Sequence, residues 1–344
     1  MVEPRSRRAR AGELAVLNRE GAAALIAEGV RVLVVGDLMI DRYIRGEVDR
    51  VSPEAPVPVV RVHDTASSLG GAANVVANLA ALGARAFVAG VVGGDPAGAW
   101  LRDGLEALGA DPSGVVIDRD RPTTTKTRLV SRHQQIARFD EEEDELVAPA
   151  QERALIDSVR ARAPESDVMV VADYDKGVMT PSVIDAVVGA GQALGVPVVI
   201  DPKLRHFFGY GGATLFKPNV RELGQALGEP VRSEDPAWME RVFRRIGCAH
   251  LLLTRGDRGM ALFDHEGLAV LPATARAVFD VSGAGDTVAA VTGVVLGGGG
   301  SVRDAAVLAN AAAGVAVGQS GVSPVAPEEL LESFPDDSAG VSHP

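Results

Sequence analysis

Short apolar runs alternate with stretches of helical spacing along most of the chain. Arg31–Gly36 is rich in Val, too short for a helix, and typical of a strand that is covered on both faces. Asn74–Gly83 has helical spacing and ends at a glycine, as many helices do. Strands that alternate with helices indicate an α/β fold with a mostly parallel sheet. The pattern predicts further strands at Arg85–Gly93, Asp167–Asp173, Pro197–Pro202, Ala213–Asn219 and His250–Gly256, and helices at Ser182–Leu194 and Ala237–Ile246.

Several predicted strands close with a polar residue. In open α/β sheets, ligands bind in the crevice beyond the carboxyl ends of the strands. We therefore expect the chemical groups of the protein to lie along one edge of the sheet. The residues in question are Asp173, Asp201, Asn219 and Thr254.

Two segments break the alternation. The first, about residues 42–63, is too rich in proline for a helix or a central strand. The second, residues 122–140, is β-branched and basic, and it has the pattern of a hairpin that turns near His133. Together they predict a small β-flap, or lid, beside the main sheet. The alternative is a pair of surface hairpins with no role.

Composition limits the classes of protein to which this chain can belong. The 344 residues are 47% hydrophobic, which is enough for a large core and for one or two domains. The single cysteine, Cys248, excludes a disulfide framework and favours a reducing, cytoplasmic setting. No apolar run approaches the roughly 18 residues of a membrane span, and no apolar run follows the basic start to make a signal peptide. The net charge of −12 argues against a nucleic-acid or anionic-membrane partner, because both prefer a basic face.

The stretch FDVSGAGDT, residues 279–287, leads into a helix-compatible run. Its glycines, Gly283 and Gly285, would stand at the helix N-terminus, where free N–H groups and the helix dipole favour an anion. Asp286 beside them is a poor phosphate ligand because like charges repel, but it suits a general base for an attacking hydroxyl. That combination describes phosphoryl transfer to an alcohol. The alternative is an aspartate that merely benefits from the helix dipole.

Three other stretches place glycines or polar residues at element ends. GGAAN, residues 70–74, again puts glycines before a helix. Asn219 and Glu222 in KPNVREL lie three apart at a helix start, so they share a face and could hold the waters of a magnesium ion. TRGDRGM, residues 254–260, ends a strand with a hydroxyl and two glycines, which suits a nucleotide phosphate. Each signal is weak alone, but their order is specific.

In this order the motifs resemble the ribokinase-like (PfkB) family of carbohydrate kinases, which implies a three-layer α/β sandwich with a β-flap. There is no Walker A motif, so the P-loop route is not available. Within the family, VVGDLMIDRYIRGEVDRVSPEAPVPVVRV, LGGAANVVANLAALGA, ADYDKGV and FDVSGAGDT are similar to the kinase domain of bacterial heptose-7-phosphate kinases of ADP- or GDP-heptose synthesis. The resemblance covers roughly Gly29 to Val325.

The resemblance implies a role for each matching residue. Asp286 would be the base for the anomeric hydroxyl, and the backbone of Gly283, Ala284 and Gly285 would form the anion hole. ATP and Mg²⁺ would be the cofactors, with a monovalent cation as a further candidate. The sugar would contact Asp37, Asp41, Gly70, Gly71 and Asn74. The ATP site would comprise Lys203, Asn219, Glu222, Thr254, Gly256, Gly259 and Asn310, with Asn219 and Glu222 organising magnesium through water.

A phosphorylated sugar also needs cations. The basic hairpin could supply them, and a guanidinium can grip a phosphate with two hydrogen bonds. Asp173 and Lys176 of the DYDKG stretch are further candidates for the substrate site. The alternatives are a solvated hairpin face and a local surface ion pair between Asp173 and Lys176. The hairpin cations are Lys126, Arg128, Arg132 and Arg138.

These matches imply an ATP-dependent kinase that turns D-glycero-D-manno-heptose 7-phosphate into the 1,7-bisphosphate. Two alternatives stay open: another PfkB kinase, for ribose, fructose 1-phosphate or a secondary-metabolite sugar, and a non-catalytic sugar-phosphate binder. No motif reports the anomer of the product.

We expect one kinase domain over residues 29–328, between an N-terminal extension, 1–28, that is partly disordered and a frayed tail, 329–344. We also expect a homodimer that pairs through the flap. Bifunctional members of the subgroup carry a nucleotidyltransferase domain with an H-x-G-H motif. The six histidines here do not form that motif, so we expect the kinase step alone.

Overall fold

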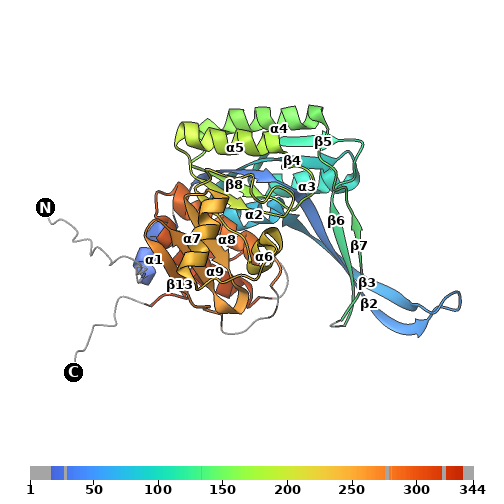
Figure 1. Ribbon diagram of the computed structural model, residues 1–344. Helices are drawn as coiled ribbons and strands as arrows, with labels where there is room; N and C mark the ends of the chain where they lie inside the picture. The colour runs from blue at the N-terminus through green and yellow to red at the C-terminus, as the bar shows by residue number, and fades with distance from the viewer. Residues whose placement is uncertain are drawn as a thin grey trace, which may run out of the picture.

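A large, mostly parallel sheet crosses the middle of the protein in the computed structural model (Figure 1). The structure describes residues 17–26, 29–132, 134–275, 279, 281–319 and 323–335. The strands of this sheet are β1 (Arg31–Gly36), β4 (Arg85–Gly93), β5 (Asp111–Asp118), β8 (Val168–Ala172), β9 (Val198–Asp201), β10 (Leu215–Phe216), β11 (His250–Thr254), β12 (Met260–Asp264) and β13 (Gly267–Leu271). Their order is β13-β12-β11-β10-β9-β8-β1-β4-β5, and only the β11–β12 and β12–β13 pairs are antiparallel.

Helices cover both faces of this sheet. On β1, Val32 and Val34 belong to one core and Leu33 and Val35 to the other, because successive side chains of a strand point to opposite faces. No helix in the described ranges is long and apolar enough to cross a membrane. The first core is closed by α2 (Ala72–Ala81), α3 (Pro96–Ala107), α8 (Ala284–Gly297) and α9 (Val302–Ala316). The second is closed by α4 (Pro149–Arg162), α5 (Pro181–Leu194), α6 (Val220–Leu227) and α7 (Pro236–Ile246).

Local sequence sets where these elements end. The run Ala213–Asn219 was expected to be a strand, but β10 contains only two residues. Pro218, which has no N–H for the ladder, limits the strand at its carboxyl end. Beyond it Asn219 and Thr254 still pair in an isolated bridge, so the two polar residues remain adjacent at the carboxyl edge.

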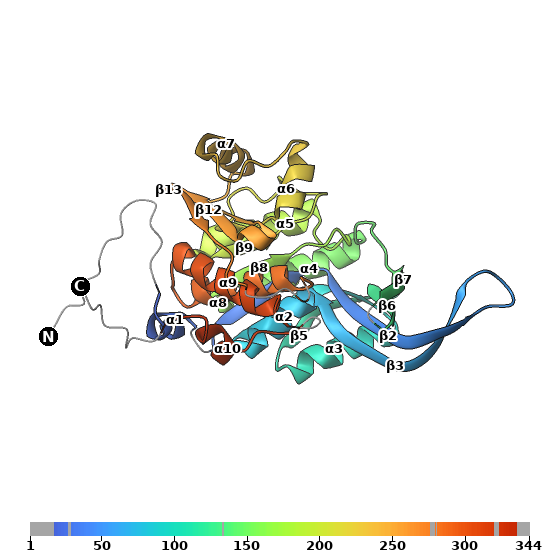
Figure 2. The ribbon, with the colours of Figure 1, turned by 90° about the horizontal axis from the view of Figure 1, so that it is seen from below.

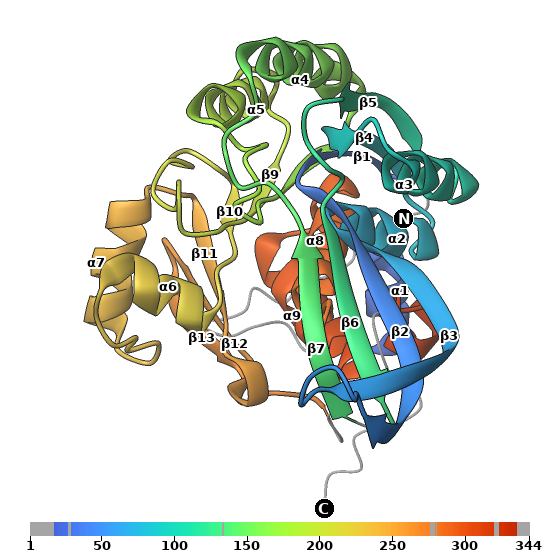
Figure 3. The same ribbon diagram turned by 90° about the vertical axis from the view of Figure 1, so that its right-hand side faces the viewer.

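The two segments that interrupt the alternation lie together in a second sheet, the flap sheet, of order β3-β2-β6-β7 (Figure 3). Its strands are β2 (Leu38–Val51), β3 (Pro58–Gly71), β6 (Thr125–Ser131) and β7 (Gln134–Glu141). The flap is therefore larger than residues 42–63 and 122–140, and β2 is an inner strand, contrary to the expectation. The proline-rich part falls in the β2–β3 turn and at the start of the edge strand β3, where no inner ladder needs a donor. His133 lies outside the described residues.

The outer halves of β2 and β3 project from the body as an arm (Figure 2). β6 pairs with β2 only from Ile40 to Gly46, whereas β3 pairs with it out to Val51. The arm thus carries a two-stranded ribbon with exposed valines. These are Val48, Val51, Val57 and Val62.

The described parts of the two chain ends pack on the body. α1 (Arg19–Leu25) contacts α10 (Pro327–Leu331). Ala22, Leu330 and Phe334 are buried in the first core. The backbone N–H of Arg19 donates to the carbonyl of Pro335 at 3.0 Å. The expectation of a frayed tail over residues 329–344 is therefore wrong for residues 329–335.

Candidate active site

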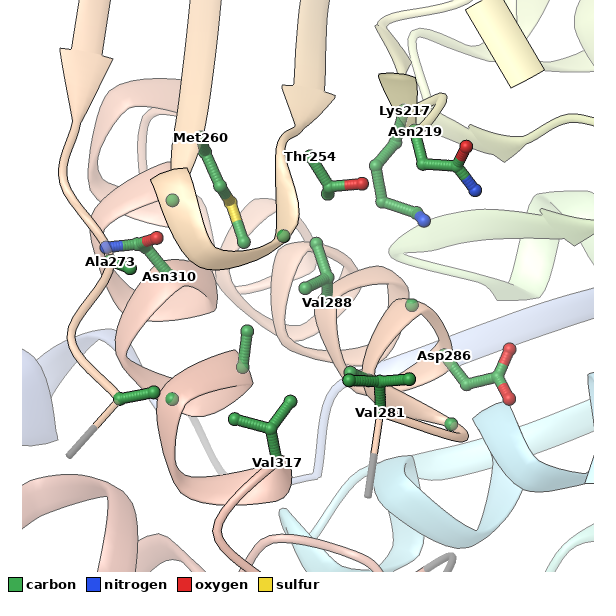
Figure 4. Close-up of a pocket in the computed structure, with 18 of the residues that line it drawn as sticks. Lys217, Asn219, Thr254, Met260, Ala273, Val281, Asp286, Val288, Asn310 and Val317 are labelled. Carbon is green, nitrogen blue, oxygen red and sulfur yellow. The ribbon is translucent and has the colours of Figure 1, made fainter. Parts of the chain in front are cut away.

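A cavity of about 390 Å³ opens at the carboxyl edge of the main sheet, beside the start of α8. Its two ends differ in chemistry (Figure 4). Met260, Ala273 and Val317 line one end, whereas Lys217 and Asp286 stand at the other. An apolar slot that leads to a charged end suits a molecule with an aromatic base and a phosphate tail.

The charged end includes the first turn of α8. Gly283 is the N-cap and adopts a φ of 79°, a left-handed conformation that glycine tolerates. A Cβ on Gly285 would lie 3.6 Å from the Lys217 Nζ and 3.7 Å from an Asp201 oxygen, so glycine keeps this space open. The Ala284 N–H is directed at the Val281 carbonyl at 3.4 Å, a long contact. The turn can therefore present backbone donors to an anion that lies opposite the lysine.

Asp286 is buried and is held by two neutral donors. Asn74 Nδ2 donates to its Oδ2 at 2.6 Å, and the Tyr174 hydroxyl donates to its Oδ1. Burial raises the pKa of Asp286 to about 6, while the hydrogen bonds from Tyr174 and Asn74 oppose that rise. The carboxylate is thus poised to take a proton near neutral pH.

Two lysines place positive charge beside this carboxylate. Lys217 is almost fully buried and pairs with Asp201 at 3.0 Å. Lys203 pairs with Glu222 and lies over the Tyr174 ring, 5.1 Å from its centroid. Burial tends to lower the pKa of Lys203, but Asp201 and Glu222 raise it overall, so the ammonium stays charged. Both cations line the cavity.

Asn219 and Glu222 form a capping box at the start of α6. Asn219 Oδ1 accepts from the Glu222 N–H at 2.8 Å, and Glu222 Oε2 accepts from the Asn219 N–H at 2.9 Å. Among the residues that the structure describes, no group of three or more His, Cys, Asp or Glu side chains could hold a metal ion. A magnesium ion near this pair would keep several of its own waters, as this ion usually does.

The residues expected at the ATP site line the same cavity. Thr254 ends β11, and Gly256 begins the short 3₁₀ helix η2 (Gly256–Arg258). Gly259 has a φ of 76°, and a Cβ there would lie 2.1 Å from the Leu271 carbonyl. Asn310 stands on α9 and donates to the Pro272 carbonyl at 2.8 Å, which fixes its amide beside the apolar slot.

Residues expected to bind the sugar lie where the flap meets the body. Asp41 on β2 is buried and forms an ion pair with Arg128 of β6. A Cβ on Gly70 would lie 2.4 Å from the Asp41 carboxylate, so only glycine allows this close approach. Gly71 follows with a φ of 56° as the N-cap of α2, which carries Asn74 to Asp286.

The other expected phosphate ligands are also paired with carboxylates. Lys126 contacts Glu142 at 2.7 Å, and Arg138 contacts Asp140 at 2.6 Å. Lys176 contacts Glu142 at 2.9 Å and Asp144 at 2.6 Å. It does not pair with Asp173, so the expected alternative of a local surface ion pair is wrong. Arg132 lies in the β6–β7 turn with a φ of 55°.

Asp37 and Asp173 do not line the cavity. The Asp37 oxygens accept three backbone N–H groups of the loop after β8, residues 173–178. Asp173 is buried, accepts from the Tyr210 hydroxyl at 2.7 Å and caps the Asp175 N–H at 2.9 Å. The structure therefore occupies both expected sugar ligands with contacts inside the protein.

Sequence reasoning missed three residues at the charged end. Lys217 stands in the KPN stretch that was singled out, yet only its asparagine received a role. Asp201 was noted as a strand end without a task. Tyr174 follows Asp173 directly, and no local pattern distinguishes it from a core tyrosine. The strand-end position was the available signal for Asp201 and Lys217.

Comparison with known proteins agrees with this geometry. A model of the pfkB family carbohydrate kinases matches residues 30–329. The chain belongs to the pfkB family of carbohydrate kinases. It is 46% identical over 309 residues to the bifunctional protein HldE of Citrifermentans bemidjiense and 45% identical over 318 residues to that of Azorhizobium caulinodans. Those alignments cover 89% and 91% of this chain but only 63% and 66% of the relatives, so the chain spans less than two thirds of their length.

Solved structures of a ribokinase and a phosphofructokinase share the fold. Arabidopsis thaliana ribokinase complexed with ribose and ATP superposes with a TM-score of 0.68 at 20% identity, covering 89% of this chain and 99% of that one. Escherichia coli phosphofructokinase-2 in complex with potassium superposes with a TM-score of 0.71 at 16% identity. That superposition covers 90% of this chain and 98% of the other. At these identities the likeness shows the fold alone.

Proposed function

We propose that this carbohydrate kinase transfers the γ-phosphoryl group of ATP to the C1 hydroxyl of D-glycero-D-manno-heptose 7-phosphate, giving the 1,7-bisphosphate. The observation that carries the proposal is the buried carboxylate of Asp286 at the N-terminus of α8, at the charged end of the cavity. The choice of sugar rests on the SPEAPVP stretch of the flap and on the relatives named HldE.

In the proposed reaction, Asp286 removes the proton of the C1 hydroxyl while that oxygen attacks the γ-phosphorus. The new bond joins the C1 oxygen to the γ-phosphorus, the broken bond joined the γ-phosphorus to the oxygen that leaves with ADP, and the proton stays on Asp286 until solvent takes it. The first turn of α8 and Lys217 face the charge that develops on the transferred group. A bound magnesium ion would supply further neutralisation of the phosphate charge, held through water near Asn219 and Glu222.

The apolar slot would hold the adenine of ATP. Met260, Val288 and Val317 offer flat or flexible apolar surface, and Asn310 lies beside them. Thr254, Gly256 and Gly259 would then follow the phosphates toward the charged end. This direction places the γ-phosphate nearest Asp286, as the reaction requires.

The sugar phosphate would bind under the flap sheet. Arg128 and Arg138 stand directly opposite each other on β6 and β7, on the strand face that also carries Lys126. Like charges so close are unfavourable unless an anion lies between or beside them. Asp41 and Asp140 provide that charge in this structure, and the 7-phosphate would take over part of that task.

Product analysis by ³¹P NMR tests the function. The protein is mixed with MgATP and D-glycero-D-manno-heptose 7-phosphate, with ribose and fructose 1-phosphate in parallel. A new anomeric phosphate signal with the heptose alone supports the proposal, and its coupling assigns the anomer. Turnover of another sugar would keep the Asp286 chemistry and change the substrate. No turnover, with each monovalent cation tested in turn, would favour a sugar-phosphate binder.

We further propose a homodimer that pairs through the flap. The arm leaves its valines exposed, with Val51 66% and Val57 52% accessible, and it extends well beyond the rest of the flap sheet (Figure 2). A projecting ribbon with unpaired edges favours pairing with another chain.

A further inference from the structure

The loop after β8, residues 173–178, reaches the charged end of the cavity through one side chain. Tyr174 lines the cavity, and its hydroxyl donates to Asp286 Oδ1. Burial and then the nearby Asp286 charge raise the pKa of the Tyr174 hydroxyl well above its usual value, so this group stays protonated and donates. The tyrosine comes from a segment 112 residues away in sequence.

Buried carboxylates hold this loop in shape. Asp37 Oδ2 accepts the Tyr174 N–H at 2.7 Å and the Lys176 N–H at 3.2 Å, and its Oδ1 accepts the Val178 N–H at 3.2 Å. The loop contains Asp175 with a φ of 57° and Gly177 with a φ of 86°. Such a path needs outside contacts to stay ordered, and Asp37 supplies three of them.

The second donor to Asp286 is oriented just as firmly. Asn78 Nδ2 donates to the Asn74 carbonyl at 2.9 Å and faces the Asn74 Oδ1 at 3.4 Å. Thr287 donates to the Asn78 Oδ1 at 2.9 Å. The Asn74 amide therefore turns its oxygen to Asn78 and its NH₂ to Asp286. Each carboxylate oxygen of the base thus has its own fixed donor, and each keeps a lone pair for a substrate proton.

We propose that Tyr174 is a positioning residue for the base: it orients Asp286 and favours its ionised form, while Asp37 holds Tyr174 in place through the 173–178 loop. The inference rests on the proposed role of Asp286. It gives Asp37 a task that differs from the sugar contact expected from the sequence. It also gives a reason for a buried aspartate to accept three backbone N–H groups from one loop.

Several charged groups act on Asp286 from the elements around it. Asp201 at the end of β9 raises its pKa, whereas Lys217 after β10 lowers it. Lys203 lies over the Tyr174 ring and interacts electrostatically with the same carboxylate. Tyr174, by contrast, can be altered without a change of charge, because its hydroxyl is neutral.

The test is the pH dependence of kcat/KM in Tyr174→Phe. Asp286 must be ionised to act as a base, so activity is lost as the pH falls through its pKa. Loss of one hydrogen bond to the carboxylate raises that pKa, and the acidic limb should move up by about one to two pH units. The kcat on the plateau should fall as well, because the carboxylate loses one of its two orienting contacts. A limb that stays in place would overturn the proposal.

Tyr210→Phe is the matched control. It also removes a buried tyrosine hydroxyl that donates to a buried carboxylate, Asp173, but that carboxylate does not line the cavity. Its acidic limb should coincide with that of the wild type. An equal shift in both variants would indicate a general loosening of the fold rather than positioning of Asp286.

A direct titration separates this inference from the proposed function. The protein is labelled with ¹³C at aspartate carboxyls, and Asp286→Asn identifies the resonance of Asp286. In Tyr174→Phe this resonance should titrate about one to two units higher, even if the sugar assignment fails. An unchanged titration would overturn the inference while leaving the kinase reaction intact.

A double variant tests the link through the loop. If Asp37 acts by holding Tyr174, then Asp37→Asn should shift the acidic limb in the same direction. Asp37→Asn combined with Tyr174→Phe should then shift it no further than Tyr174→Phe alone. Additive shifts would show that Asp37 acts on the base by another route.

Discussion

The surroundings of Asp286 and the flap sheet both gather charged groups, but they neutralise them differently. Asp286 is buried against two neutral donors, Tyr174 and Asn74. On the flap sheet Lys126, Arg128 and Arg138, three of the cations proposed for the sugar phosphate, each pair with a carboxylate, as Arg128 pairs with Asp41. The first arrangement leaves the base ready for a proton. The second requires an exchange of partners when an anionic substrate arrives.

This contrast separates chemistry from recognition. A preorganised site avoids reorganisation during the reaction, which is where electrostatic catalysis gains most. An ion-paired binding face keeps its cations oriented and tolerable in the absence of substrate, at the expense of affinity. Substitutions at Asp286 should therefore change kcat, whereas substitutions of the flap cations should change KM.

The largest effect should come from Asp286→Asn. The amide keeps the shape of the side chain but cannot accept the proton, so kcat should fall by roughly 10²–10⁴-fold. Steady-state kinetics with the sugar phosphate measures this. Asp167→Asn is the control, because Asp167 precedes β8 at the opposite edge of the sheet and pairs with Arg31. Turnover near the wild-type level in Asp286→Asn would remove this residue from the base role and end the contrast.

A smaller effect is expected from Arg138→Ala. Loss of a charge-assisted contact to the 7-phosphate should raise the KM for the sugar phosphate by about 10- to 100-fold and leave the KM for ATP unchanged. Initial rates at varied concentrations of each substrate separate the two. Arg128→Ala should act in the same direction.

Arg61→Ala is the matched control for the arginine variants. Arg61 pairs with Asp49 on the exposed arm, away from the other flap cations. It should leave both KM values as they are. If neither Arg138→Ala nor Arg128→Ala changes the KM for the sugar phosphate, the phosphate binds elsewhere.

The local pattern of apolar and polar residues predicts most of the architecture. The bounds of β1 and β4 match the expectation to the residue, because a strand that is covered on both faces must be apolar throughout. The strand-end rule likewise brings Asp201, Asn219 and Thr254 to one cavity, and the helix-start pattern brings Asp286 there. Tertiary contacts decide the rest. Nothing near Tyr174 in the sequence reveals that its hydroxyl meets a carboxylate 112 residues away.

The same limit applies to charges. Local sequence marked Lys126, Arg138 and Lys176 as cations, but not the carboxylates that face them across strands and loops. The prediction that the proline-rich segment contains no inner strand was wrong for a similar reason. Its prolines lie in the turn and on the edge strand, and only the pairing of β2 with β6 makes β2 an inner strand.

A third prediction concerns stability at buried carboxylates that do not line the cavity. Burial, and then the neighbouring Asp37, raise the pKa of Asp173 to about 7. Because this pKa is raised in the folded state, the contribution of protonated Asp173 to the free energy of unfolding is present at pH 4. That contribution is lost as the pH rises toward 7. The free energy of unfolding of Asp173→Asn should therefore exceed that of the wild type by roughly 2–4 kcal/mol at pH 8 and by little at pH 4.

Urea denaturation at the two pH values measures this difference. Asp167→Asn gives the opposite sign as a control, because the hydrogen bond from Arg31 lowers the pKa of Asp167 and the loss should appear at pH 8. An Asp173→Asn variant that is destabilised equally at both pH values would show that its carboxylate is a conventional hydrogen-bond partner. The buried network behind the 173–178 loop would then not store unfavourable charge.

The smallest effect on the folded chain should come from the arm, where the flap region is proposed to meet a second copy. Val51→Asp places a charge on a residue that is already 66% exposed, so the free energy of unfolding of one chain should change by no more than about 0.5 kcal/mol. Light scattering should nevertheless show the mass fall from two chains toward one. Val270→Asp, on the exposed face of β13, should leave the mass unchanged. A wild-type protein that is monomeric at working concentration would refute the dimer, and a Val51→Asp dimer would move the interface off the arm. The monomer result would confine the role of the flap to holding the substrate, and its ion pairs would then have to be explained by that task alone.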